Sequence, residues 1–127
     1  MVISRYVLKT LNNVSKAKIN IKPLSVNQAF KGRRFKTEAY KKYERDLLFL
    51  LPKIELPEPP YQVYYKFGFS SRNSDIDNGV KQLQDVLSKK YKFNDRYIFR
   101  MVVEKEIVKK GDEFVEFKIE TFKEKER

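Results

Sequence analysis

The stretch YQVYYKFGF (residues 61–69) places large apolar or aromatic side chains at every second position. Successive side chains of a strand point to opposite faces, so these alternate positions share one face. The five side chains on that face are Tyr61, Val63, Tyr65, Phe67 and Phe69. We predict a strand here with one buried face, and the segments on either side supply the rest of the fold.

Upstream of this strand, the sequence predicts one more strand and one helix. Residues 16–22 alternate in the same way and indicate a half-buried strand. Residues 24–36 are expected to form a loop. Thr37 is a good N-cap residue for a helix that ends before Pro52. The proline-rich residues 56–60 are expected to form a stiff connector within one domain.

Downstream, the pattern predicts a second helix and two further strands. The helix runs from about Asp77 to Lys90, and its spacing indicates a buried stripe. The stripe consists of Ile76, Val80, Leu83 and Leu87. Residues 97–109 and 113–121 are expected to pair as a hairpin closed around a Lys-Gly-Asp turn at 110–112.

The order strand, helix, strand, helix, strand, strand predicts an α+β fold. We expect a small mixed sheet of about four strands with two main helices packed on one face. A chain of 127 residues is long enough for one hydrophobic core and too short for two of ordinary size. Residues 1–127 are therefore expected to form a single domain.

The chain is strongly basic, with 28 Lys and Arg against 17 Asp and Glu and a formal net charge of +11. Such an excess favours a polyanionic partner, and nucleic acid is the first candidate. The sequence has no signal-peptide apolar run at its start and no apolar segment of membrane-spanning length. We therefore expect a cytoplasmic protein that does not enter a membrane.

The absence of cysteine and histidine restricts the possible chemistry. It excludes disulfides, Cys/His zinc sites, thiol nucleophiles and imidazole bases. Catalysis would have to use carboxylates and lysines. Oxygen ligands select hard cations, so the expected metal is Mg²⁺, with Mn²⁺ as a substitute.

Four of the six aspartates lie between residues 75 and 95. Asp75 and Asp77 are two residues apart at the mouth of the predicted helix, where both side chains can point the same way. Asp95 follows the helix and would join them if the chain returns to the same end of the sheet. Clustered carboxylates repel one another unless a cation neutralises them, so the cluster predicts a metal site.

The first turns of the predicted helix add a basic side chain to this cluster. Asp77, Lys81 and Asp85 are spaced by four and form one stripe opposite the apolar one. Lys81 is expected to stabilise the phosphate or the leaving group during hydrolysis. Asp85 is expected to orient a lysine or to support the metal ligands.

Simpler roles for these residues remain open. Asp75 or Asp77 can cap the helix, and the Asp77-Lys81-Asp85 stripe can be a solvated row of ion pairs. A metal-dependent nuclease could also be built from a different set of residues, in which Glu116 and Lys118, on one strand face, combine with Asp95. That pattern is also typical of any exposed strand face.

The loop before the first helix carries a second cationic cluster. Four cations alternate with two phenylalanines. The cations, expected to bind the DNA backbone, are Lys31, Arg33, Arg34 and Lys36. Phe30 and Phe35 are candidates to stack on bases or to wedge between them. The alternative is a solvated turn whose phenylalanines fold into the core.

These residues together resemble the RusA-type Holliday junction resolvases, small endodeoxyribonucleases of bacteria and prophages. The resemblance covers most of the chain and includes Pro-Leu-Ser-Val-Asn at 23–27 and the basic loop. It is strongest in the string D-x-D-N-x-x-K-x-x-x-D at 75–85, followed by Asn94-Asp95. Many members have Asp-Asp at 94–95 and a basic residue at position 74, where this chain has Ser74 and places Arg72 two residues earlier.

The resemblance implies that Asp75, Asp77 and Asp95 bind Mg²⁺ and are catalytic, and that Lys81 is the essential basic residue. Asp85 and Asn78 would support these ligands, and Arg72 would contact DNA. It also implies a homodimer, because a four-way junction has near two-fold symmetry and needs paired cuts.

The expected function is therefore Mg²⁺-dependent, structure-selective cleavage of four-way DNA junctions in recombination and repair. Two alternatives come from other classes. One is a nucleic-acid-binding module without catalysis, and the other is a phage replication or regulatory protein that keeps the fold and binds a protein partner.

Overall fold

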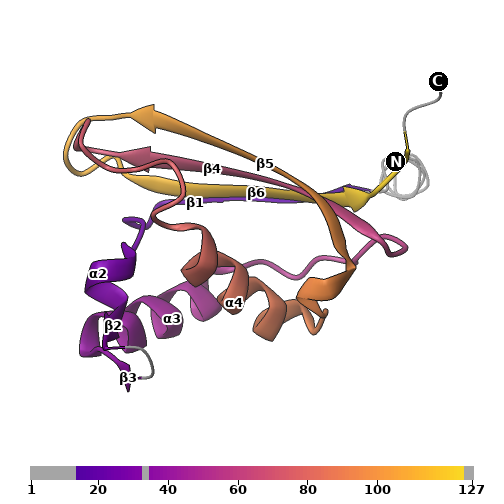
Figure 1. Cartoon of the computed structure of the whole chain (residues 1–127), viewed down its shortest axis with the longest axis horizontal. Helices are drawn as coiled ribbons and strands as arrows, with labels where there is room; N and C mark the ends of the chain where they lie inside the picture. Colours follow the sequence, from indigo (N-terminus) through magenta and orange to yellow (C-terminus); the bar gives the residue numbers. More distant parts are fainter. Residues whose placement is uncertain (1–13, 33–34, 125–127) are drawn as a thin grey trace, which may run out of the picture.

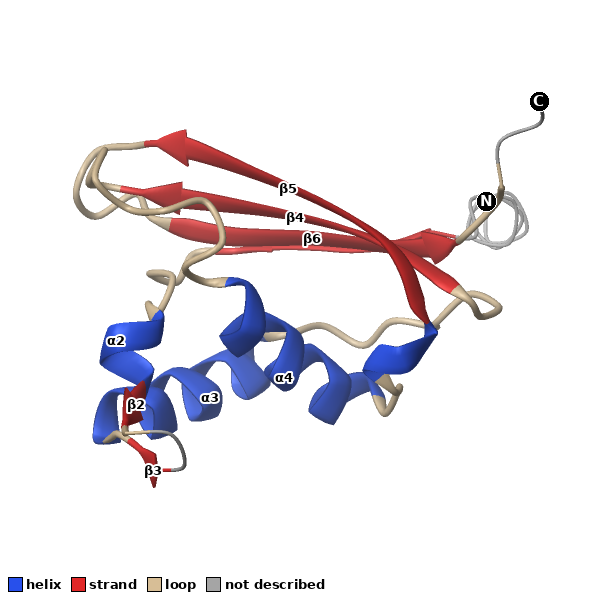
Figure 2. Cartoon of the chain, in the orientation of Figure 1, coloured by secondary structure: helices blue, strands red, loops and turns tan. Residues whose placement is uncertain are grey.

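The computed structural model describes residues 14–32 and 35–124. It shows a four-stranded sheet that is covered on one face by helices (Figures 1 and 2). The elements in chain order are β1 (Val14–Ile19), α2 (Val26–Ala29), β2 (Phe30–Lys31), β3 (Phe35–Lys36), α3 (Glu38–Leu50), β4 (Tyr61–Phe69), α4 (Val80–Tyr91), the 3₁₀ turn η1 (Asp95–Tyr97), β5 (Ile98–Ile107) and β6 (Phe114–Thr121). This arrangement confirms the predicted α+β class with a mixed four-stranded sheet.

Strand β4 lies inside the sheet, whose order is β1-β6-β4-β5. It pairs antiparallel with β6 and parallel with β5. Its bounds and its alternation are those predicted, and Val63, Tyr65 and Phe67 are fully buried under the helices. The unit β4-α4-β5 is thus a strand-helix-strand crossover, which is how parallel neighbours are usually joined.

The predicted hairpin of the last two strands is wrong. β5 and β6 both exist close to their expected bounds, but β4 lies between them. The chain reaches β5 through α4, so β5 must run parallel to β4, and β6 then takes the other side of β4. The loop of residues 108–113 therefore passes over the end of β4, where the amide of Val108 donates to the carbonyl of Phe69 at 2.8 Å.

The two long helices follow their local sequence signals. Thr37 caps α3, because its hydroxyl accepts a hydrogen bond from the amide of Tyr40 at 3.1 Å. Lys92 ends α4 in a left-handed conformation with φ of 59°. The buried side chains of the two helices are Tyr40, Tyr43, Leu47, Gln82, Leu83, Val86 and Leu87. No helix in the described ranges is long and apolar enough to cross a membrane.

Three details differ from the sequence prediction. The first strand, predicted over residues 16–22, is β1 at Val14–Ile19 and ends earlier. The expected loop 24–36 contains the short helix α2, whose cap Ser25 and Gln28 form a reciprocal capping box, and the two-residue strands β2 and β3. In the α4 stripe, Ile76 is exposed, whereas Gln82 is fully buried. The Gln82 amide donates to the carbonyl of Leu24 at 2.8 Å and to that of Asn78 at 3.0 Å. These hydrogen bonds allow a polar side chain on the buried face of α4, which the pattern did not predict.

On the outer face of the sheet, Gly68 makes room for an aromatic ring. Gly68 lies opposite Phe114 across β4 and β6, and a methyl group at Gly68 would come within 2.4 Å of the Phe114 ring. Lys18 covers the same ring, with its ammonium 4.2 Å from the ring centroid. The ring is only 3% exposed although it lies on the face without helices.

We expect Gly68→Ala to destabilise the protein by about 1–3 kcal/mol, because the new methyl group overlaps the ring. Without that overlap, alanine in a strand should stabilise by about 0.5–1 kcal/mol relative to glycine. Urea unfolding measures the change. In a Phe114→Ala background the cost of Gly68→Ala should disappear, and an unchanged cost there would contradict this explanation.

Candidate functional site

Asp75 and Asp77 lie in the loop that connects β4 to α4, at the carboxyl ends of the parallel strands β4 and β5. Short turns hold this loop, since the amide of Asn78 donates to the carbonyl of Asp75 at 3.1 Å and that of Val80 to Asp77 at 3.2 Å. Carboxyl ends of parallel strands are a common place for ligand sites in open sheets. The loop is therefore well placed for a functional site.

The carboxylates of Asp75 and Asp77 are exposed, and no side-chain hydrogen bond or ion pair holds either of them within the described ranges. They do not cap α4, whose N-cap is Gly79 without a side-chain hydrogen bond. The structure therefore contradicts the alternative in which Asp75 or Asp77 caps this helix. Two solvent-facing acids remain available to a ligand.

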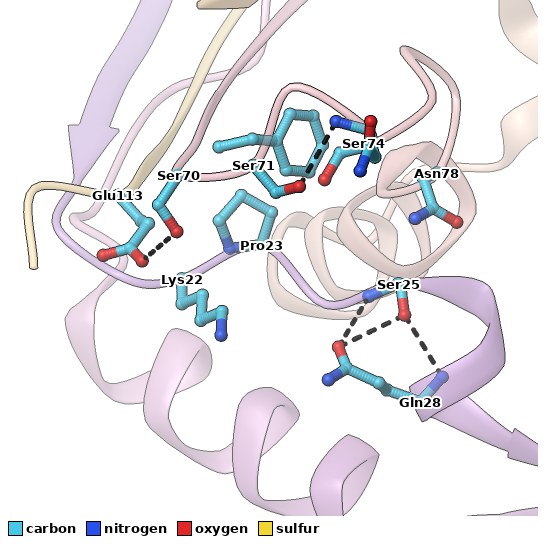
Figure 3. A pocket seen from close by; sticks show the side chains of 11 residues that line it. Lys22, Pro23, Ser25, Gln28, Ser70, Ser71, Ser74, Asn78 and Glu113 are labelled. Atoms are coloured by element: carbon cyan, nitrogen blue, oxygen red, sulfur yellow. Dashed lines mark hydrogen bonds between the residues drawn. The ribbon is translucent and has the colours of Figure 1, made fainter. Parts of the chain in front are cut away.

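A polar groove of about 360 Å³ borders this loop (Figure 3). Its lining residues are Lys22, Pro23, Ser25, Gln28, Phe69, Ser70, Ser71, Asn73, Ser74, Asn78 and Glu113. In Figure 3 the Ser70 hydroxyl, which donates to Glu113 at 2.8 Å, and the Ser25–Gln28 pair lie on different sides of Pro23. Hydroxyl and amide groups dominate the lining, so the groove offers many hydrogen-bond donors to an oxygen-rich ligand.

Glu113 contributes a fixed negative charge to the groove. Hydrogen bonds from its own backbone amide, from Ser70 and from the Gly111 amide lower the pKa of its carboxyl group, and the charge of Lys22 acts in the same direction. Glu113 therefore stays ionised at neutral pH and holds the loop 108–113 against β4.

Exposed cations lie in the loops that border the groove. Lys22 lines it, Arg72 lies in the β4-α4 loop, and Lys109 and Lys110 lie in the neighbouring β5-β6 loop. None of these four forms an ion pair with another residue in the part of the chain that the structure describes. Lys105 is instead committed to structure, because its ammonium donates to the carbonyl of Ser74 at 2.6 Å and fixes the β4-α4 loop on β5.

Lys81 and Asp85 lie together on α4, as the spacing predicted. The Lys81 ammonium is 3.5 Å from the Asp85 carboxylate, which also accepts the hydroxyl of Tyr40 at 3.4 Å. Asp77 takes no part in this row. Burial, followed by the charges of Asp85 and Glu44, raises the pKa of Tyr40, so its hydroxyl stays protonated and acts as a donor.

Asp95 lies at the other end of the strands. It begins η1, directly before β5, whose first residue Ile98 pairs with Tyr61 at the start of β4. Helix α4 separates the segment that contains Asp95 from the loop that contains Asp77. At about 1.5 Å per residue, this helix is about 18 Å long. Within the described residues no group of three acidic side chains is close enough to hold one metal ion. A single chain thus brings Asp75 and Asp77 into one loop without Asp95.

The basic loop is only partly described. Arg33 and Arg34 lie outside the described residues. Lys31 is exposed, and Lys36 pairs with Glu44 at 3.3 Å. Burial opposes ionisation of Glu44, but hydrogen bonds from Lys89 and Lys36 outweigh it and lower the pKa of Glu44.

The two phenylalanines of this loop have different environments. Phe30 is half-buried and packs edge-on against Tyr40, with ring centroids 5.4 Å apart. This is the alternative in which the phenylalanine folds toward the core. Phe35 is 73% exposed, so of the two it is the one whose ring is accessible to a base.

Several groove residues were not identified from the sequence. Lys22, Gln28, Ser70, Ser71 and Glu113 come from separate segments of the chain. Of these, only the serines at 70, 71 and 74 form a local cluster that could have marked the groove. Asn78, predicted to support the metal ligands, accepts a hydrogen bond from the amide of Val26 at 3.4 Å and so joins α2 to the groove.

Comparison with protein-family models gives no match for this chain, and comparison with curated proteins gives none either.

Proposed function

We propose that this protein is a Mg²⁺-dependent endodeoxyribonuclease that cuts branched DNA, with four-way junctions as its substrate. The observation that supports this proposal best is the pair of exposed carboxylates of Asp75 and Asp77 after β4, which have no hydrogen-bond or ion-pair partner among the described residues. Exposed cations lie in the same loop and in the neighbouring loops. The resemblance of residues 75–85 to RusA-type resolvases supplies the substrate class.

The donor set suits Mg²⁺. This ion usually keeps several water molecules and binds one or two carboxylates together with substrate phosphate oxygens. Asp75 and Asp77 would hold it, because both are exposed and neighbours in one loop. When bound, the ion supplies Lewis-acid activation of the phosphate and a nucleophilic water at neutral pH.

The other residues of the site act on the DNA. Lys81 is 67% exposed in the first turn of α4, four residues after Asp77, and would present its ammonium to the negative charge that grows during cleavage. Lys22, Arg72, Lys109 and Lys110 bind backbone phosphates along the groove. The hydroxyls of the 70–74 turn donate to phosphate oxygens.

A nucleic-acid-binding module without catalysis is the second candidate. The exposed cations of the loops that border the groove favour it, because phosphate binding by lysine and arginine needs no metal ion. The two functions differ in one property, since a binding module retains junctions but leaves their phosphodiesters intact with Mg²⁺ or Mn²⁺.

Asp77→Asn is expected to reduce Mg²⁺-dependent junction cleavage by at least about 100-fold, because it removes one of two metal ligands. Junction binding in EDTA should be retained or tightened, because a charge that repels phosphate is lost. A gel assay with a synthetic four-way junction measures both.

Asp46→Asn is the matched control. Asp46 is an acid on α3 that pairs with Lys42 at 2.9 Å, and its loss should leave cleavage unchanged. Equal cleavage by wild type and Asp77→Asn would contradict the assigned role of Asp77, and binding without any cleavage by wild type would establish the binding-module alternative.

The double variant Lys109→Gln/Lys110→Gln is expected to weaken binding to all DNA sequences alike. Each lost phosphate contact reduces the slope of log K against log salt by about 0.9, so the slope should fall by up to about 2. Fluorescence anisotropy at several salt concentrations measures it. Lys53→Gln, another exposed lysine, is the control, and a slope unchanged in the double variant would remove these two lysines from the interface.

A further inference from the structure

Gln82 is a polar residue on the buried face of α4. Its side chain has no exposed surface, like those of Leu83, Val86 and Leu87 on the same helix. Apart from tyrosines, the buried polar side chains in residues 14–32 and 35–124 are Ser15 and Gln82. A buried amide opposes folding unless its polar groups are hydrogen-bonded. The partners of Gln82 therefore indicate its role.

The amide nitrogen of Gln82 joins three segments of the chain. Nε2 donates to the carbonyl of Leu24 at 2.8 Å and to that of Asn78 at 3.0 Å. Leu24 directly precedes Ser25, the N-cap of α2, and Asn78 directly follows Asp77. One buried amide on α4 thus holds both the start of α2 and the loop of the acidic pair.

A third hydrogen bond links α2 to this loop on the side of the groove. The Asn78 side chain accepts the amide of Val26 at 3.4 Å and lies next to the Ser25 end of α2 in Figure 3. This bond is long and exposed, whereas the bonds from Gln82 are shorter and wholly or partly buried. Hydrogen bonds are stronger where water is excluded. Gln82 therefore makes the stronger of the two links.

The carbonyl end of the same amide does not help folding. Oε1 of Gln82 is buried and has no hydrogen-bond partner among the described residues. An unpartnered buried oxygen is unfavourable, and an apolar side chain of similar size would avoid it. Packing alone therefore does not explain a glutamine here, whereas the two bonds from its nitrogen do. Departures from the local pattern of this kind are typical of functional sites.

We propose that Gln82 is a positioning residue of the acidic site, which fixes the loop of Asp75 and Asp77 relative to α2. Lys105 anchors this loop before Asp75, through the carbonyl of Ser74, and Gln82 anchors it after Asp77. Because α2 leads directly into β2 and the basic loop, Gln82 also sets the metal-binding segment relative to a DNA-binding one. This role at the site rests on the proposed function, whereas the hold on the loop does not.

Gln82→Met tests the role, because methionine keeps the length of the side chain and removes both donated bonds. Val86→Ala is the matched control. It is fully buried on the same helix, one turn farther from the loop, and its cavity destabilises the protein without removing a hydrogen bond. The thermal unfolding midpoints of the two variants show how far each is destabilised as a whole.

Hydrogen exchange followed by NMR reads the loop without any metal ion. In Gln82→Met the amides of Asn78 and Ala29, which lie on the two sides of the link, should exchange about tenfold faster, the size expected for one lost hydrogen bond. In Val86→Ala they should change no more than the amides of β4. Unchanged exchange of both amides in Gln82→Met would overturn the proposal.

Mn²⁺ binding, measured from the electron paramagnetic resonance signal of the free ion, reads the site itself. Gln82→Met should weaken Mn²⁺ binding about tenfold, as expected when a residue that supports metal ligands is lost. The Mn²⁺ concentration for half-maximal junction cleavage should rise by the same factor, and Val86→Ala should keep the wild-type values. Wild-type Mn²⁺ affinity in Gln82→Met would overturn the positioning role.

Gln82→Asn is the second variant if Gln82→Met does not fold, because asparagine keeps the amide but is one methylene shorter. It is expected to keep at most one of the two bonds and to change exchange and Mn²⁺ affinity in the same direction. Global unfolding of both variants would assign Gln82 to core packing and overturn the proposal. If the wild type neither binds Mn²⁺ nor cleaves, the proposed function fails, and exchange alone decides whether Gln82 holds the loop.

Discussion

The pairing of β4 on both sides is the constraint on which the rest of the structure depends. Its alternation gives it one face for the helices, and the crossover through α4 fixes β5 parallel to it. β6 is then left with the other side of β4, and β1 joins β6. Three loops consequently meet at the carboxyl end of β4, which is where the groove and the acidic pair lie.

The acidic pair at this end belongs to a strongly basic protein. Some acids of the described chain form ion pairs, as Glu44 does with Lys36 and Lys89 and Glu106 does with Lys66. Asp75 and Asp77 lack such partners within the described chain, although lysines and arginines are abundant near them. Exposed acids that are kept apart from available cations are consistent with a role toward an external ion and a phosphate substrate.

Local sequence signals predicted most of the elements and part of the site. The alternation of residues 61–69 and the cap at Thr37 predicted β4 and the start of α3, because side-chain direction and capping depend on near neighbours. The spacing of Asp75, Asp77, Lys81 and Asp85 likewise predicted one acidic loop and one ion pair on α4.

The tertiary structure decided what depends on distant segments. It separated β5 from β6 by β4, buried Gln82 and exposed Ile76, and placed Asp95 at the far end of α4 from Asp77. Strand order and register arise from contacts between residues far apart in the chain, where no local pattern distinguishes a hairpin from a crossover. The sequence by itself therefore determined which residues could form the site, whereas the sheet decided which of them one chain brings together.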